Sequence, residues 1–185
     1  EVSSGGMVQR AGAKIGDDIF VTGTIGHGFI GLEDAKAERS SPCRDLFEYP
    51  QPPLAFALVA ASYMSAAVDV SDGLAADLGH ICKASVCGMQ IDLPAIPFAD
   101  PVSKNLLAQL NGGDDYQLAF TAASENHDKL KQLAAEQSIQ LSKIGHITDG
   151  SDLILLNSDG LTLDYSSTGT SQELPSGFSH FGMKK

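Results

Sequence analysis

The chain has 185 residues, of which 43% are hydrophobic and 19% are charged, and this balance favours a folded domain with a sizeable core over a disordered chain. Its 23 Asp and Glu residues outnumber its 12 Lys and Arg residues, so the formal net charge is −11. This charge excludes nucleic acid and anionic membrane surfaces as expected partners, because both are bound through clustered basic side chains. An acidic protein binds phosphate groups mainly with the help of metal cations.

The first half of the chain is predicted to alternate strands and helices after a polar, glycine-rich linker or tail at residues 1–9. Short β-branched runs indicate strands, and apolar residues at helical spacing indicate helices. The prolines at 50, 52 and 53 mark a helix start, since proline is favoured at the first helical position. In order, we expect a strand at 19–24, a helix at 28–36, a polar surface connection at 33–45, a helix at 54–65, a strand at 66–70 and a helix at 74–85.

The second half ends in strands that have no helices between them. We expect a strand at 89–93, a helix at 104–110, a strand at 116–121, a helix at 125–137 capped by Ser124, and strands at 140–147, 153–157 and 162–165. This order favours an α+β fold, a layered α/β/α domain with a mixed sheet, over a doubly wound parallel sheet.

The three cysteines, Cys43, Cys82 and Cys87, form no C-x-x-C pair and predict neither a disulfide framework nor a zinc site. Cys82 and Cys87 lie in an apolar stretch typical of buried, reduced thiols. No apolar run reaches about 18 residues and no signal peptide is visible, so we expect a cytoplasmic protein. Because the chain begins at Glu1 without Met, we also expect a fragment of a longer protein.

The strongest chemical signal is the segment from Asp69 to Gly73, Asp-Val-Ser-Asp-Gly. A strand there is predicted to deliver Asp69, Ser71 and Asp72 to the point where a helix begins. One or two carboxylates suffice to hold Mg²⁺, and helix N-termini favour anions. The alternative is that Ser71 or Asp72 is a plain helix cap, with Asp69 in a turn.

Weaker signals lie elsewhere. Asn111-Gly-Gly-Asp-Asp115 is either a loop that approaches a ligand closely or an ordinary turn. Arg10 and Lys14 either contact a phosphate or are solvated bases, and Phe178 either stacks on a heteroaromatic ring or packs on the core. Residues 23–28 resemble a glycine-rich loop, but no Walker-type phosphate loop is present. His80 and His146 are predicted to be core or surface residues, since spacing identifies no partner for either.

These segments occur together in a known family. The chain resembles the C-terminal domain of the thiamine-monophosphate kinases, within the aminoimidazole-ribonucleotide-synthetase-related superfamily. The resemblance implies that residues 10–181 are the C-terminal kinase domain and 182–185 a tail, with an N-terminal ATP and metal domain absent from this chain. The matching stretches are RAGAKIGDDIFVTGTIG (10–26), AAVDVSDGLAADLGHICKAS (66–85), CGMQIDLPAIPF (87–98), NGGDDYQLAFT (111–121), KIGHIT (143–148) and GFSHF (177–181).

The resemblance implies an enzyme that uses ATP and Mg²⁺ to phosphorylate thiamine monophosphate to thiamine diphosphate. It assigns Mg²⁺ binding to Asp69 and Asp72, contact with the nucleotide phosphates to Ser71, a place near ATP to Arg10, a substrate contact to Asp114 and packing on thiamine to Phe178. It assigns no catalytic residue. It also implies contact with the enzyme's own N-terminal domain, through which the homodimer of the full-length protein mainly forms.

The sequence departs from the family pattern at four positions. Asp114 and Gln117 stand where the family usually has Glu, Phe178 replaces Trp or Tyr, and Pro53 replaces an Arg. The Gly-Asp-Asp at 16–18 belongs to another matched segment and does not replace the metal motif of the missing domain. We therefore expect the isolated chain to be inactive.

The implied mechanism is direct in-line phosphoryl transfer. The acceptor is itself a phosphate, so catalysis requires positioning and charge neutralisation but no strong base. Two alternatives stay open. One is another ATPase of the superfamily, such as aminoimidazole ribonucleotide synthetase or selenophosphate synthetase, and the other is a non-catalytic binding module.

Overall fold

The structure is a computed structural model that describes residues 7–165, apart from the side chains of residues 163–165. Within this range a seven-stranded sheet forms the centre of the molecule, in the order β2-β4-β1-β5-β3-β6-β7. All neighbouring strands are antiparallel except β3 and β6, which are parallel. The strands are β1 (Asp18–Thr22), β2 (Ala66–Val70), β3 (Gly88–Asp92), β4 (Gln117–Ala122), β5 (Leu141–Thr148), β6 (Leu153–Leu156) and β7 (Thr162–Tyr165).

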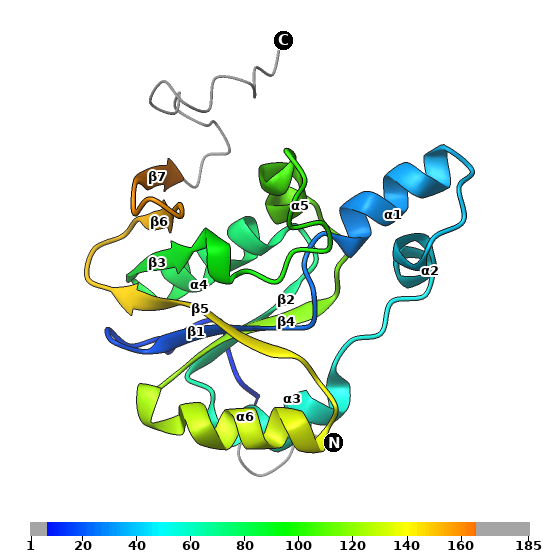
Figure 1. The fold of residues 1–185 in the computed structure, drawn as a ribbon. Coiled ribbons are helices and arrows are strands. Elements are labelled where there is room, and N and C mark those ends of the chain that lie inside the picture. Colours follow the sequence, from blue (N-terminus) through cyan, green and yellow to red (C-terminus); the bar gives the residue numbers. More distant parts are fainter. Residues whose placement is uncertain (1–6, 166–185) are drawn as a thin grey trace.

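Helices lie on both faces of the sheet (Figure 1). One face packs against α4 (Leu74–Ser85) and α5 (Leu106–Asn111), and the other packs against α3 (Leu54–Ala60) and α6 (His127–Glu136). On the second face Phe20 and Phe120 stack with their ring centroids 5.3 Å apart. The expected α+β fold with a mixed, layered sheet is confirmed.

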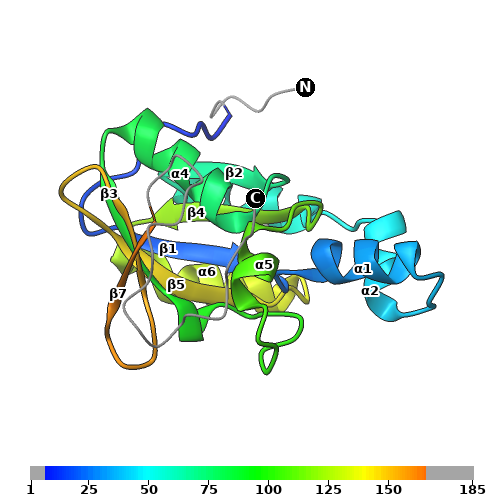
Figure 2. The same cartoon turned by 90° about the horizontal axis from the view of Figure 1, so that it is seen from above.

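The helices α1 (His27–Lys36) and α2 (Pro42–Glu48) extend together beyond one end of the sheet (Figure 2). The prediction of a polar connection at 33–45 is wrong over most of its length. Ser41 begins α2 by accepting a hydrogen bond from the Arg44 N–H at 3.1 Å, and Pro42 follows as the first helical residue. A serine cap followed by proline is a helix-start signal that the charged composition of this stretch concealed.

Three other predicted boundaries differ from the structure. The helix predicted at 54–65 ends at Ala60 and continues as the 3₁₀ turn Ala61–Tyr63, and the helix predicted at 104–110 begins at Leu106. Ser124 is not the cap of α6, because it lies in the 3₁₀ turn Ser124–Asn126. Its hydroxyl donates to Asp18 instead, at 2.9 Å, so a tertiary contact replaces the expected local one.

Other expectations concern the cysteines and the membrane. Cys82 and Cys87 are buried free thiols, and burial raises the pKa of Cys82 to about 12. Among residues 7–165, each helix is too short or too polar to cross a bilayer.

Candidate functional site

The segment Asp69 to Gly73 meets the loop 111–116 because β2 and β4 are antiparallel neighbours. Their register pairs Asp69 with Leu118 and Val70 with Gln117, so the end of β2 lies beside the beginning of β4. The two loops continue this pairing. The Tyr116 N–H donates to the Val70 carbonyl at 2.8 Å, and the Asp114 N–H donates to the Ser71 carbonyl at 3.0 Å.

Glycines allow these two loops to touch. Gly73 has a φ of 109°, and a Cβ atom added to it would lie 2.7 Å from the carbonyl carbon of Asn111. Gly113 approaches the Ser71 carbonyl in the same way. Side chains at either position would separate the loops, so the glycines of both motifs serve the contact between them.

Asp77, in the first turn of α4, holds the Ser71–Asp72 turn in place. Its Oδ2 accepts hydrogen bonds from the Ser71 and Asp72 N–H groups, both at 3.0 Å, and the residue is only 1% exposed. Burial raises the pKa of this carboxyl, and the nearby charges of Asp72 and Asp69 raise it further. The N-cap residue of α4 is Gly73, and no side chain caps this helix with a hydrogen bond. The alternative that Ser71 or Asp72 is a plain helix cap is therefore wrong.

Asp69 and Asp72 are both exposed, and they contribute to one acidic surface. The Asp72 carboxylate lies beside Asp77 and His80, with one potential ligand atom from each residue within 4.8 Å of the others. The pKa of the Tyr116 phenol is raised, first by its hydrogen bond to Asp114 and also by the charges of Asp69 and Asp72. The charges of Asp69, Asp72 and Asp114 therefore all act on the same phenol.

The donor chemistry of this surface suits a hard cation. Within residues 7–165, neither Asp69 nor Asp72 forms an ion pair with a basic side chain, so both carboxylates are available as oxygen ligands. Ser71 lies between them and is partly exposed. His80 is exposed at the same surface, and its partner Asp77 lies three residues earlier on α4, a helical spacing that could have identified it from the sequence.

Arg10 and Asp69 line one open hollow of about 660 Å³ beside the edge strand β2. Arg10 is exposed, and its carbonyl accepts a hydrogen bond from the Ser85 hydroxyl at 3.2 Å. The Ala67 N–H donates to the Gln9 carbonyl at 2.9 Å, so this segment follows the strand that carries Asp69. The structure therefore brings a predicted nucleotide contact and a predicted metal ligand to the same edge.

Asp115 was not singled out by the sequence, yet it is the buried acid of the second loop. Its carboxylate accepts hydrogen bonds from the Gly26 and Gly28 N–H groups at 2.8 and 2.9 Å. Burial raises its pKa to about 6 against the opposing effect of these donors. Because the amides of the glycine-rich loop at 23–28 already bind Asp115, this loop does not act as a phosphate cradle through them.

Asp114 has a different environment from its neighbour. Its φ is 65°, and its Oδ1 accepts a hydrogen bond from the Tyr116 hydroxyl at 3.1 Å. It lines a cavity of about 250 Å³ together with His27, Asp115 and Gln117. The Gln117 side chain accepts a hydrogen bond from the Thr22 hydroxyl at 2.9 Å. Phe178 lies outside the described residues.

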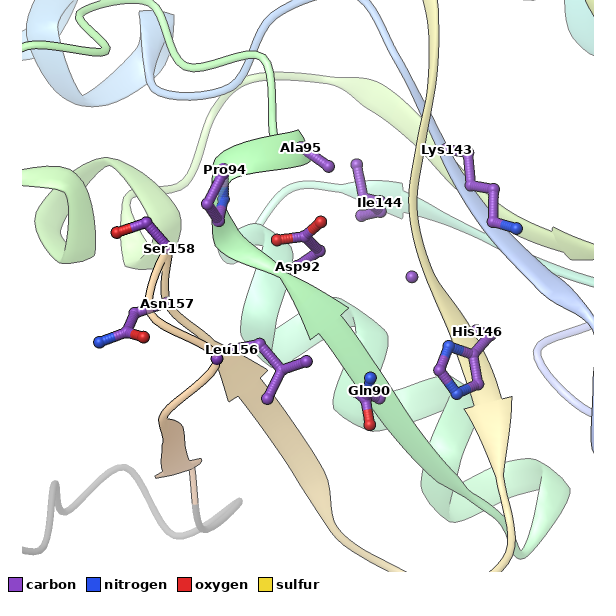
Figure 3. A pocket seen from close by; sticks show the side chains of 12 residues that line it. Gln90, Asp92, Pro94, Ala95, Lys143, Ile144, His146, Leu156, Asn157 and Ser158 are labelled. Atoms are coloured by element: carbon purple, nitrogen blue, oxygen red, sulfur yellow. The ribbon is translucent and has the colours of Figure 1, made fainter.

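A larger cavity, of about 700 Å³, opens on the sheet over β3, β5 and β6 (Figure 3). It contains none of the predicted site residues. Its basic side chain, Lys143, already forms an ion pair of 2.7 Å with Asp18. The cavity is therefore separate from the acidic surface at the end of β2.

Comparison with known proteins shows the family of this domain. Residues 14–156 match the family described as AIR synthase related protein, C-terminal domain. The chain belongs to this family. It is 35% identical over 181 residues to the thiamine-monophosphate kinase of Escherichia coli O157:H7, covering 89% of this chain and 55% of that protein. It thus spans about half the length of the curated relatives it matches.

Two solved structures are similar to this AIR synthase related domain over most of its length. The thiamine-monophosphate kinase of Stenotrophomonas maltophilia K279a superposes with a TM-score of 0.75 at 33% identity, over 83% of this chain and 53% of that one. AaThiL complexed with AMPPCP and TMP has a TM-score of 0.71 at 26% identity, over 86% of this chain and 52% of that one.

Proposed function

We propose that this chain is the C-terminal part of a thiamine-monophosphate kinase, which transfers a phosphoryl group from ATP to thiamine monophosphate and forms thiamine diphosphate. The observation that carries the proposal is the acidic surface at the end of β2, where Asp69 and Asp72 have no basic partner among the described residues. The relatives that carry this name support it, as does the solved relative complexed with AMPPCP, an ATP analogue, and TMP.

The proposed roles are those that the family resemblance implies, placed on that surface. Asp69 and Asp72 would hold Mg²⁺, which neutralises phosphate charge when bound. Ser71 would contact the nucleotide phosphates from the turn that Asp77 holds. Arg10 would lie near ATP, since it lines the same hollow as Asp69. We assign no general base, because the acceptor phosphate is already largely deprotonated at neutral pH.

The acceptor would bind at the second loop. Asp114 would contact thiamine monophosphate, and Phe178, beyond the described residues, would pack on its thiamine portion. The cavity beside Asp114 is lined by Asp114 and Asp115 and by no Lys or Arg among the described residues, which favours the positively charged thiazolium ring.

The proposed organisation makes residues 10–181 the kinase domain, between a linker at 1–9 and a tail at 182–185. A separate N-terminal domain would supply the remaining ATP and metal ligands and most of the homodimer contact. The share of the E. coli relative that the chain covers, 55%, leaves room for such a domain.

A substrate panel on the complete protein tests this proposal. With ATP and Mg²⁺ we expect thiamine diphosphate from thiamine monophosphate, and no ATP-dependent product from formylglycinamidine ribonucleotide or selenide, the substrates of the superfamily alternatives. Turnover of either alternative without thiamine diphosphate would contradict the proposal. Absence of every product, with Mg²⁺ and nucleotide leaving the melting temperature unchanged, would favour a non-catalytic module.

A further inference from the structure

Asp115 joins the loop that carries Asp114 to the beginning of α1. Both of its carboxylate oxygens are used, one on the Gly26 N–H and one on the Gly28 N–H, and only 7% of the residue is exposed. Hydrogen bonds to an ionised carboxylate are stronger than those between neutral groups. Asp115 therefore fixes where its neighbour Asp114 lies relative to α1.

Asp114 is in a conformation that its surroundings stabilise. Its φ of 65° belongs to the left-handed region, which residues other than glycine adopt uncommonly. Two contacts surround it: the hydrogen bond from its own N–H to the Ser71 carbonyl, and the bonds of Asp115 to α1. Gly28 also lies against this loop, because a Cβ atom there would be 2.7 Å from the Asp114 carbonyl carbon.

We propose that Asp115 is a positioning residue for the phosphate acceptor. It holds Asp114 in the left-handed conformation and so keeps the Asp114 carboxylate at the cavity between α1 and β4. Asp115 acts on the acceptor through Asp114, because each of its own oxygens already accepts a backbone hydrogen bond. This inference rests on the proposed function, in which Asp114 contacts thiamine monophosphate.

A purely structural role for Asp115 makes a different prediction, and α1 offers a matched control for it. Asp34, near the other end of α1, is also a buried carboxylate, with 8% exposure. It accepts hydrogen bonds from Arg39 Nε at 2.8 Å and from the Ser41 hydroxyl at 2.5 Å. Asp34→Asn removes a similar buried charge at the other end of the helix that Asp115 contacts, but its hydrogen bonds involve neither loop of the site.

The test is steady-state kinetics of the complete enzyme and its Asp115→Asn and Asp34→Asn variants, with thiamine monophosphate and ATP varied separately. Asparagine is neutral, so its oxygen can accept only one of the two hydrogen bonds, now uncharged, and its NH₂ group cannot accept the other. We expect Asp115→Asn to raise the KM for thiamine monophosphate at least about tenfold, as the loss of a hydrogen bond to a charged group implies. The kcat and the KM for ATP should stay within about twofold of wild type, and Asp34→Asn should leave all three constants unchanged.

An unchanged KM for thiamine monophosphate in Asp115→Asn, or an equal rise in Asp34→Asn, would overturn the inference. If Asp115→Asn does not fold, Gly28→Ala decides, since it keeps the carboxylate but moves the Asp114 loop. It should raise the same KM, and a normal KM there would also overturn the inference. A wild-type enzyme that makes no thiamine diphosphate would instead contradict the proposed function, and the inference would fall with it.

Discussion

At the scale of single residues, the site depends on four acids that have opposite surroundings. Asp69 and Asp72 are exposed and have no basic partner within residues 7–165, so their charges are available to a ligand. Asp77 and Asp115 are buried, and each accepts two backbone N–H bonds. The exposed pair is proposed to bind Mg²⁺, whereas the buried pair accepts the backbone hydrogen bonds that hold the two loops in place.

Removing either exposed acid should reduce turnover without unfolding the enzyme. We expect Asp69→Ala and Asp72→Ala to lower the kcat of the complete enzyme at least about a hundredfold, because phosphoryl transfer depends on charge neutralisation at the metal. Asp92→Ala is the matched control, since Asp92 is also an exposed acid at the end of a strand but lies away from this surface. Near-normal kcat in both site variants would contradict the metal assignment.

The buried Asp115 should make stability depend on pH. Its folded pKa, about 6, lies above the ordinary value of 3.8, so the folded state binds the proton more tightly than the unfolded state. The stability that this difference provides is complete below pH 3.8 and is lost as the pH rises through about 6. Relative to Asp115→Asn, the wild-type chain should lose about 2 kcal/mol between pH 4 and 7, measured by urea unfolding. A constant difference between the two proteins across this range would refute the shift.

At the scale of elements, the antiparallel pairing of β2 with β4 creates the site. One glycine-containing loop follows β2 and the other precedes β4, and the register places the two loops in contact. The helix α4 then leaves from the first loop, and its Asp77 reaches back to the turn before it. A short stretch of chain thus provides both the exposed acids and the group that orients them.

Gly73 is the position at which this arrangement is most sensitive to a side chain. Gly73→Ala adds a Cβ atom 2.7 Å from the Asn111 carbonyl carbon at a φ of 109°, so we expect a loss of about 2–4 kcal/mol in unfolding free energy. Gly79→Ala, in the middle of α4 with no atom within 4 Å, should instead be neutral or stabilise by up to about 1 kcal/mol. Thermal or urea unfolding of the two variants compares them directly, and equal stabilities would disprove the contact.

At the scale of the whole molecule, the described residues form one layered domain, with the acidic surface at the end of β2 and a second, unrelated cavity over β3, β5 and β6 (Figure 3). The chain covers about half of each relative, and the proposed kinase needs ligands from the other half.

The 185-residue chain by itself should therefore fold but not catalyse. We expect cooperative thermal unfolding by circular dichroism, because both faces of the sheet have their own buried core. With ATP, Mg²⁺ and thiamine monophosphate we expect no thiamine diphosphate, whereas the complete protein under the same conditions should form it. Turnover by the isolated chain would show that the proposed second domain is dispensable.

The sequence by itself determined the α+β class and most strands, and it singled out the segment 69–73 as a candidate site, because these depend on local patterns of apolar, glycine and acidic residues. It did not predict α2, whose serine cap and proline were outweighed by a charged composition, nor the tertiary bond that takes Ser124 away from its expected cap. The tertiary structure alone decided which acids are buried. Asp77 and Asp115 look like any other acid in the chain, and only the folded backbone amides of Ser71, Asp72, Gly26 and Gly28 distinguish them. The physical reason is that burial and hydrogen bonding are properties of surroundings assembled from distant segments, which local spacing does not encode.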